Sequence, residues 1–350
     1  MFSKKSILLV ITILMVFSCL VFSISYAADK PIILQLAHAD PEDVFTSKTH
    51  AQAIIFKNLV NARSGGRIEV QVFGGGALGG EREYVESVMV GTIQAGLASD
   101  VLAGFCPETM LTSIPYLFPS ASIAWKVLDG PFGSKLSKIL LEKTGLRNLA
   151  FAETGFRNFT NSKRPIRTPS DMKGLKIRVQ ESPLYITLVN SLGASPTPIP
   201  WTECYTALQS KVVDGEENPI STIVYANFQE VQKYLTLDGH VYAVDWFVIN
   251  DKFFKSLSED LQYIILDCAI ISSTVCRGVQ QLNSFAVGLQ KLIDAGMEIY
   301  APTEEEMNLF RNVSQGPVIE WLKTQVDIKL INELLVAVDK AVAEQKAAIQ

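Results

Sequence analysis

The sequence predicts an α/β protein with two lobes. Segments typical of strands alternate along the chain with segments typical of helices, which is the pattern of an α/β fold. A length of 350 residues is enough for about two domains. Because no internal repeat or low-complexity linker divides the sequence, we expect the chain to cross between two lobes rather than to form two separate beads.

The N-terminus is typical of a secretory signal peptide. Two lysines precede an uncharged and mostly apolar run from Ser6 to Val21, and Ser25-Tyr26-Ala27 supplies small residues for cleavage after residue 27. A retained membrane anchor fits less well, since the run is near the lower length limit and no positive cluster follows it. Lipoprotein processing at Cys19 is an alternative that stays open. We expect an exported, periplasmic protein.

The first half of the mature chain is predicted from apolar periodicity. Residues 32–37 form a short apolar run typical of a buried strand, and residues 50–62 form an amphipathic helix ended by Gly65 and Gly66. Polar and apolar residues alternate from Arg67 to Phe73, as in a strand with one buried face. The remaining elements expected here are a helix at 81–89, a strand at 92–98, a helix at 122–143 and a strand at 146–153.

The second half follows a basic, proline-rich stretch at residues 163–169. Ser182-Pro183 is a good helix start, and Thr303 with Glu306 forms a capping box that opens another helix. The elements expected here are strands at 175–179 and 241–249 and helices at 182–193, 200–209, 258–294, 303 onward and 317–347.

Charge excludes one class of function. The net charge is −5, and removal of the two leader lysines takes it to −7. A protein without a basic excess cannot bind nucleic acid through bulk neutralisation of phosphates.

The segment from Gly74 to Gly79 matches the G-x-G-x-x-G pattern of dinucleotide-binding proteins, but its surroundings do not fit. The helix that follows carries Glu81, Glu83 and Glu86, which complement a helix N-terminus and would repel a pyrophosphate. We expect these glycines to let a loop pass close to a ligand or hinge, with no bound cofactor.

Few residues suit catalysis or metal binding. The sequence has three histidines, His38, His50 and His240, and neither an H-E-x-x-H nor a G-x-S-x-G motif. Cys268 and Cys276 are eight residues apart in one helical segment, about 12 Å, which is too far for a disulfide. We expect buried thiols, no metal site and no enzymatic activity.

Several polar groups suit the binding of an anion. Arg157 lies beyond the strand at 146–153, and Arg178 lies within the strand at 175–179. An arginine in an apolar strand either turns to solvent or is paired, and a guanidinium aimed at a ligand carboxylate is the second reading. Trp201 and Asn218 flank the next helix, where they could stack on a ligand and hydrogen-bond to it.

The motifs around these residues resemble one exported family. The matching blocks are residues 76–81, 115–118, 157–161, 163–166, 171–179, 192–200 and 207–209, with Val213-Asp214-Gly215-Glu216-Glu217-Asn218-Pro219 as the strongest. Together they resemble the extracytoplasmic solute-binding subunits of TRAP transporters, in the dicarboxylate- and sialic-acid-binding branch.

The resemblance implies a ligand-binding site. It places the carboxylate-binding arginine at Arg178, a second cleft arginine at Arg157, the cleft asparagine at Asn218 and the aromatic cover at Trp201. Two acidic positions of the sialic-acid binders fall at Glu81 and Ser99 of this chain. The serine departs from that pattern and argues against sialic acid. His38 is also a candidate, and direct ligand contact by Glu81, Ser99 and His38 stays open.

The resemblance also implies a periplasmic-binding-protein-like fold, with a ligand cleft between two lobes and a long connecting helix. We expect lobe I to hold residues 28–154 and about 244–283, and lobe II residues 155–243 and about 284–350. The implied function is capture of a small organic acid, such as a uronate or aldonate, and delivery to one small and one large sodium-coupled membrane subunit by a monomer. A C4-dicarboxylate or aromatic acid, and a sensor- or ABC-linked binding protein, are the alternatives.

Overall fold

The structure is a computed structural model that describes residues 30–348. The predicted signal peptide and Cys19 lie outside the described residues. The chain divides into a short N-terminal unit that ends at Ile32 and a compact unit from Ile33 onward.

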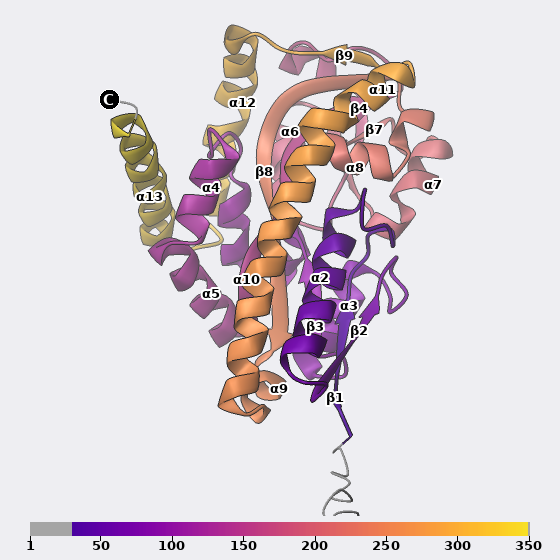
Figure 1. The fold of residues 1–350 in the computed structure, drawn as a ribbon. Helices are drawn as coiled ribbons and strands as arrows, with labels where there is room; N and C mark the ends of the chain where they lie inside the picture. Colours follow the sequence, from indigo (N-terminus) through magenta and orange to yellow (C-terminus); the bar gives the residue numbers. More distant parts are fainter. Residues whose placement is uncertain (1–29, 349–350) are drawn as a thin grey trace, which may run out of the picture. The chain divides into compact units, whose positions relative to one another are not determined.

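One mixed sheet of nine strands organises the compact unit, with the order β2-β1-β3-β8-β4-β7-β5-β6 and with β9 paired to β8 (Figure 1). Its strands are β1 (Ile32–Ala37), β2 (Ile68–Phe73), β3 (Ala95–Ala98), β4 (Leu146–Asn161), β5 (Lys176–Val179), β6 (Ser195–Pro198), β7 (Gly215–Asn218), β8 (Tyr234–Asn250) and β9 (Glu298–Tyr300). The α/β prediction is confirmed.

Two long antiparallel strands, β4 and β8, form the middle of this sheet. The predicted strands at 146–153 and 241–249 are only parts of them, because each strand continues past a β-bulge into a second run of pairing. One register shift lies between Glu153 and Gly155, where the glycine has a φ of 108°. The Gln280 side chain packs so closely there that a Cβ would lie 2.3 Å from its Nε2 atom.

The helices agree with the predicted pattern, except that local breaks divide three long segments and that two short helices, Ile220–Tyr225 and Asp251–Ser256, were not predicted. Gly130-Pro131 splits the helix expected at 122–143, since proline at N1 starts a new helix. The helix expected at 258–294 contains a π-helical segment, Leu282–Gly288, and residues 323–327 interrupt the helix expected at 317–347.

The helices are α2 (Lys48–Arg63), α3 (Glu81–Val90), α4 (Ala121–Leu128), α5 (Pro131–Thr144), α6 (Pro183–Ser191), α7 (Cys204–Gln209), α8 (Ile220–Tyr225), α9 (Asp251–Ser256), α10 (Glu259–Gln281), α11 (Leu289–Asp294), α12 (Glu304–Leu322) and α13 (Ile328–Ala347).

The sequence did not predict strands β6, β7 and β9. Strand β7 was missed because Gly-Glu-Glu-Asn looks like a polar turn, yet all four of its residues are buried. Its acids are accommodated because Arg157 pairs with Glu217 and Thr160 donates to Glu216.

Apolar packing holds the helices on this sheet. In one cluster, Phe56 of α2 and Ile265 of α10 pack with Phe247 of β8, and in Figure 1 α10 runs along the long strand. The four cysteines of the described part are free and buried, as expected. Across residues 30–348, no helix combines the length and apolar character needed to span a membrane.

Candidate functional site

A cavity between two sets of elements collects polar side chains. Its volume is about 60 Å³. We use the name first wall for Asp40, Lys48, Thr49, Glu81, Ser99 and Asp245, and second wall for Arg157, Arg178, Gln180, Trp201, Asn218 and Thr222. The first wall comes from the N-termini of α2 and α3, the ends of β1 and β3, and β8. The second wall comes from β4, β5, β7, their loops and helix α8.

Arg178 presents an incompletely paired guanidinium to the cavity. Its side chain is 3% exposed, and its Nε and one terminal nitrogen donate to the Ile199 carbonyl oxygen at 2.9 and 2.7 Å. These bonds fix the plane of the group and leave further N–H donors for an acceptor in the cavity. The guanidinium carbon lies 5.9 Å from the centre of the Trp201 ring, which also lines the cavity. This geometry suits a carboxylate next to a flat apolar cover.

Arg157 lines the same cavity, but a buried acid balances its charge and takes three of its five N–H donors. Nε and a terminal nitrogen both donate to the Glu217 carboxylate, the second at 2.8 Å, and the same nitrogen reaches the Glu217 carbonyl. Burial alone would raise the pKa of Glu217, but Arg157 and then His240 hold it below its usual value. Burial likewise opposes the charge of His240, while Asp238 and Glu217 raise its pKa to about 9. Arg157 therefore belongs to a buried charged network beneath the cavity.

Asn218 is oriented by a neighbouring acid. Its Nδ2 donates to Glu216 at 2.6 Å, and the same carboxylate accepts from Thr160 at 2.7 Å. The side-chain oxygen of Asn218 and its second N–H remain for the cavity. Burial raises the pKa of Glu216 to about 7, against the opposing effect of these two hydrogen bonds.

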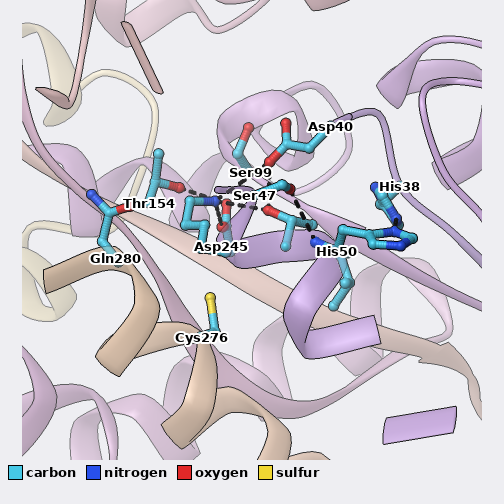
Figure 2. Close-up of polar contacts among 12 residues, drawn as sticks. His38, Asp40, Ser47, His50, Ser99, Thr154, Asp245, Cys276 and Gln280 are labelled. Carbon is cyan, nitrogen blue, oxygen red and sulfur yellow. Dashed lines mark hydrogen bonds and ion pairs between the residues drawn. The ribbon is translucent and has the colours of Figure 1, made fainter. Parts of the chain in front are cut away.

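Acidic groups surround a single buried amine on the first wall. Lys48 forms an ion pair with Asp245, donates to Thr49 at 2.9 Å and lies 3.8 Å from Asp40. Burial alone would lower the pKa of Lys48, but Asp245 and Asp40 raise it well above its usual value. Thr154 donates to the other oxygen of Asp245 at 2.5 Å. Figure 2 shows Asp40, Ser99, Thr154 and Asp245 gathered around one point.

Contacts join the two walls directly. Ser99 Oγ donates to Glu81 at 2.9 Å and lies 3.0 Å from Gln180 Oε1 on the opposite wall. Gly76, with a φ of 72°, approaches Thr202 so closely that a Cβ would lie 2.9 Å from its methyl carbon. The glycine-rich turn thus makes a close approach beside the cavity.

The structure brings six of the seven sequence-predicted ligand residues together around this cavity: Arg157, Arg178, Asn218, Trp201, Glu81 and Ser99. His38 is not among the lining residues. Its Nε2 lies 3.0 Å from Nδ1 of His50, and the two rings meet edge to face, to one side of the polar cluster in Figure 2. Burial lowers the pKa of His38 to about 4, so the ring is neutral at ordinary pH.

Asp40, Lys48 and Asp245 are lining residues that sequence reasoning missed. Asp245 lies in the apolar run Val244-Asp245-Trp246-Phe247-Val248. An aspartate within an apolar strand, like an arginine there, must be paired or turned to solvent, so this residue type in this run was a usable signal. Lys48 gave no such signal, because a lysine in the first turn of a helix is usually solvated. Among residues 30–348, no cluster of three or more His, Cys, Asp or Glu has a geometry that could hold a metal ion.

Glu216 predicts a measurable pH dependence of stability. Its pKa is about 7 in the folded protein against 4.5 as the usual value, so between these values the folded chain keeps a proton that the unfolded chain releases. This group therefore makes the free energy of unfolding fall as pH rises from about 4.5 to about 7. Glu216→Gln keeps the shape and removes the titration, and we expect a smaller loss of stability between about pH 5 and about pH 8 in urea unfolding. Glu298→Gln, at an exposed ion pair with Lys233, is the control. Equal pH dependence in the wild type and Glu216→Gln would contradict the assignment.

Comparisons with known proteins agree on one family. The family described as bacterial extracellular solute-binding protein, family 7 (DctP) matches residues 44–324. A solute-binding protein of Verminephrobacter eiseniae is 43% identical over 215 residues, which is 61% of this chain and 64% of that relative, so the chain spans slightly less than two thirds of its length.

Solved structures share the fold. The sugar acid binding protein DctPAm from Advenella mimigardefordensis, in complex with galactonate, superposes with a TM-score of 0.85 at 34% identity, over 89% of this chain and 99% of that one. A TRAP periplasmic solute binding protein from Polaromonas sp. JS666, bound to D-erythronate, has a TM-score of 0.81 at 34% identity, over 88% and 98%. The family match, the two-lobed fold of these structures and the polar cavity lead to the same conclusion: this chain belongs to the family 7 solute-binding proteins, the periplasmic binding proteins of TRAP transporters.

Proposed function

We propose that this protein captures a sugar acid, an aldonate or a uronate, in the periplasm. The observation that carries the proposal is Arg178, whose buried guanidinium is fixed by the Ile199 carbonyl and still has donors free toward a polar cavity. The relatives with galactonate and D-erythronate support this ligand class.

Each side chain has a proposed role. Arg178 clamps the ligand carboxylate, while Arg157 and Asn218 orient it, and Trp201 covers an apolar face of the carbon chain. Glu81 and Ser99 face the ligand from the first wall. Removal of water strengthens the ion pair, because the charges then interact in a low-dielectric environment.

Closure between two lobes is the proposed binding motion. Lobe I would hold residues 28–154 and about 244–283, and lobe II residues 155–243 and about 284–350. The contacts of Ser99 with Gln180 and of Gly76 with Thr202 join the two sides and would form on closing. The closed form, as a monomer, would then dock on the small and large sodium-coupled TRAP membrane subunits. We propose that it is free in the periplasm, with lipoprotein attachment at Cys19 as the minor alternative.

A thermal-shift screen of an organic-acid library tests the proposed ligand class. A ligand that binds only the native state stabilises it by mass action, so the cognate acid raises the unfolding temperature, and at equal concentration a tighter ligand raises it more. We expect aldonates or uronates to give the largest shifts, confirmed by calorimetric titration. A response to C4-dicarboxylates or aromatic acids alone would overturn the proposal.

A further inference from the structure

The two walls of the cavity differ in the charge they offer to a ligand. The second wall side of the cavity has two arginines and one acid, Glu181. Glu217 balances the charge of Arg157 and accepts from three of its five N–H donors through its carboxylate and carbonyl oxygens. Arg178 pairs with a backbone carbonyl and with no acid between residues 30 and 348, so it is the guanidinium whose charge is free for an anion, and it can form a paired contact with one carboxylate.

The first wall offers acceptors rather than a second cation. Three carboxyl groups, Asp40, Asp245 and Glu81, line the cavity there together with one amine, Lys48. The amine forms an ion pair with Asp245 and donates a hydrogen bond to Thr49, and it lies 3.8 Å from Asp40. Asp245 balances the amine, whereas Asp40 and Glu81 do not. Burial raises the pKa of Glu81 to about 7, so this carboxyl is charged only in part at neutral pH. With Asp40 unbalanced, a ligand group at this wall still meets more negative than positive charge.

A buried hydroxyl also lacks a partner at this cavity. The Thr222 side chain is 2% exposed and lines the cavity, and its Oγ1 makes no hydrogen bond to any residue between 30 and 348. Buried polar groups are almost always hydrogen-bonded, so a ligand hydroxyl or a water is the expected partner.

We propose that the first wall selects polyhydroxylated monocarboxylates and rejects a second carboxylate at the far end of the ligand. A hydroxyl group donates a hydrogen bond to Asp40, Asp245 or Glu81, whereas a carboxylate has no proton to donate and meets like charge. The inference rests on the proposed function, and it separates sugar monoacids from both aldarates and C4-dicarboxylates.

Two matched pairs of acids test this selectivity. Galactonate and galactarate differ only at C6, which is a hydroxymethyl group in the first and a carboxylate in the second. D-Erythronate and meso-tartrate differ in the same way at C4. We expect each monoacid that binds the full-length mature protein to bind at least about 100-fold more tightly than its diacid partner in calorimetric titration.

Neutralising one acid of the wall sharpens the test. Asp40→Asn leaves Lys48 paired with Asp245, and we expect the preference for the monoacid to fall at least about tenfold. Glu81→Gln serves as a second variant with the same expected direction. Asp267→Asn makes the same change of charge at an exposed ion pair with Arg63, and we expect it to keep the wild-type preference.

The outcomes separate the inference from the proposed function. If the wild type binds diacids as tightly as the matching monoacids, the selectivity is wrong while sugar-acid binding stands. If none of the four acids nor any other sugar acid binds, the proposed function fails and this inference fails with it. If a variant does not fold, the wild-type pairs still decide.

Discussion

Replacing Arg178 by alanine is expected to weaken binding of the cognate acid by roughly 30-fold to several thousand-fold. Truncating one partner of a buried, hydrogen-bonded charge pair costs about 2–5 kcal/mol, much of it from leaving the other charge unpaired in a dry site. In the absence of ligand, we expect the same substitution to lower the free energy of unfolding by less than it lowers the binding free energy. The reason is that the Arg178 side chain pairs with one backbone carbonyl and with no acid of the described chain. Calorimetric titration measures the affinity and urea unfolding the stability.

Two further variants make this result specific. Arg178→Lys keeps the charge but loses the planar fork, and we expect an intermediate affinity. Arg167→Ala removes an equal charge at an exposed position and controls for the net charge of the protein. An Arg178→Ala protein that is folded and keeps wild-type affinity would show that the carboxylate binds elsewhere.

Arg157→Ala is expected to damage the fold as well as the site. Removing one partner of a buried ion pair destabilises a protein by about 3–5 kcal/mol, because the other charge stays buried without compensation. Here Glu217 would keep only His240 as a cationic neighbour within the network. We expect the free energy of unfolding of the ligand-free protein to fall by this amount in urea unfolding, unlike the result for Arg178→Ala.

A double variant separates lost charge pairing from lost packing. Arg157→Ala combined with Glu217→Gln removes the acid that Arg157→Ala alone leaves uncompensated. The double variant should therefore lose less free energy of unfolding than the two single variants lose in sum. Full additivity of the two changes would mean that Arg157 and Glu217 do not interact energetically in the folded protein.

Much of the fold could be predicted from the sequence, because the apolar periodicity was clear and capping and turn residues marked the ends of many elements. Strand β1 and the capping box at Thr303 were predicted where they lie. Most errors fell in polar or mixed segments, because their burial and strand pairing depend on residues far away in the sequence. Strand β7 is buried only because Arg157 and Thr160 meet its acids, and no local pattern reveals that pairing.

For the site, the resemblance located the second wall better than the first. The strongest motif covers Asn218, and its neighbours Arg157 and Arg178 lie in blocks with the same resemblance, so these positions could be named. Asp40 and Lys48 lie in a segment outside the matching blocks, and they meet Asp245 only because β8 returns to the start of the chain. The prediction of a binding protein rather than an enzyme is confirmed by the family.

The long strands β4 and β8 have a consequence for how this protein unfolds. Both run through the middle of one continuous sheet, with β1, β2 and β3 joined on one side and β5, β6 and β7 on the other. Because every path from one side of the sheet to the other crosses this pair, separation of β4 from β8 divides the sheet into two parts and leaves each with a long, unpaired edge strand. Calorimetric melting should therefore show one cooperative transition, and a bound acid should shift that whole transition rather than one part of it.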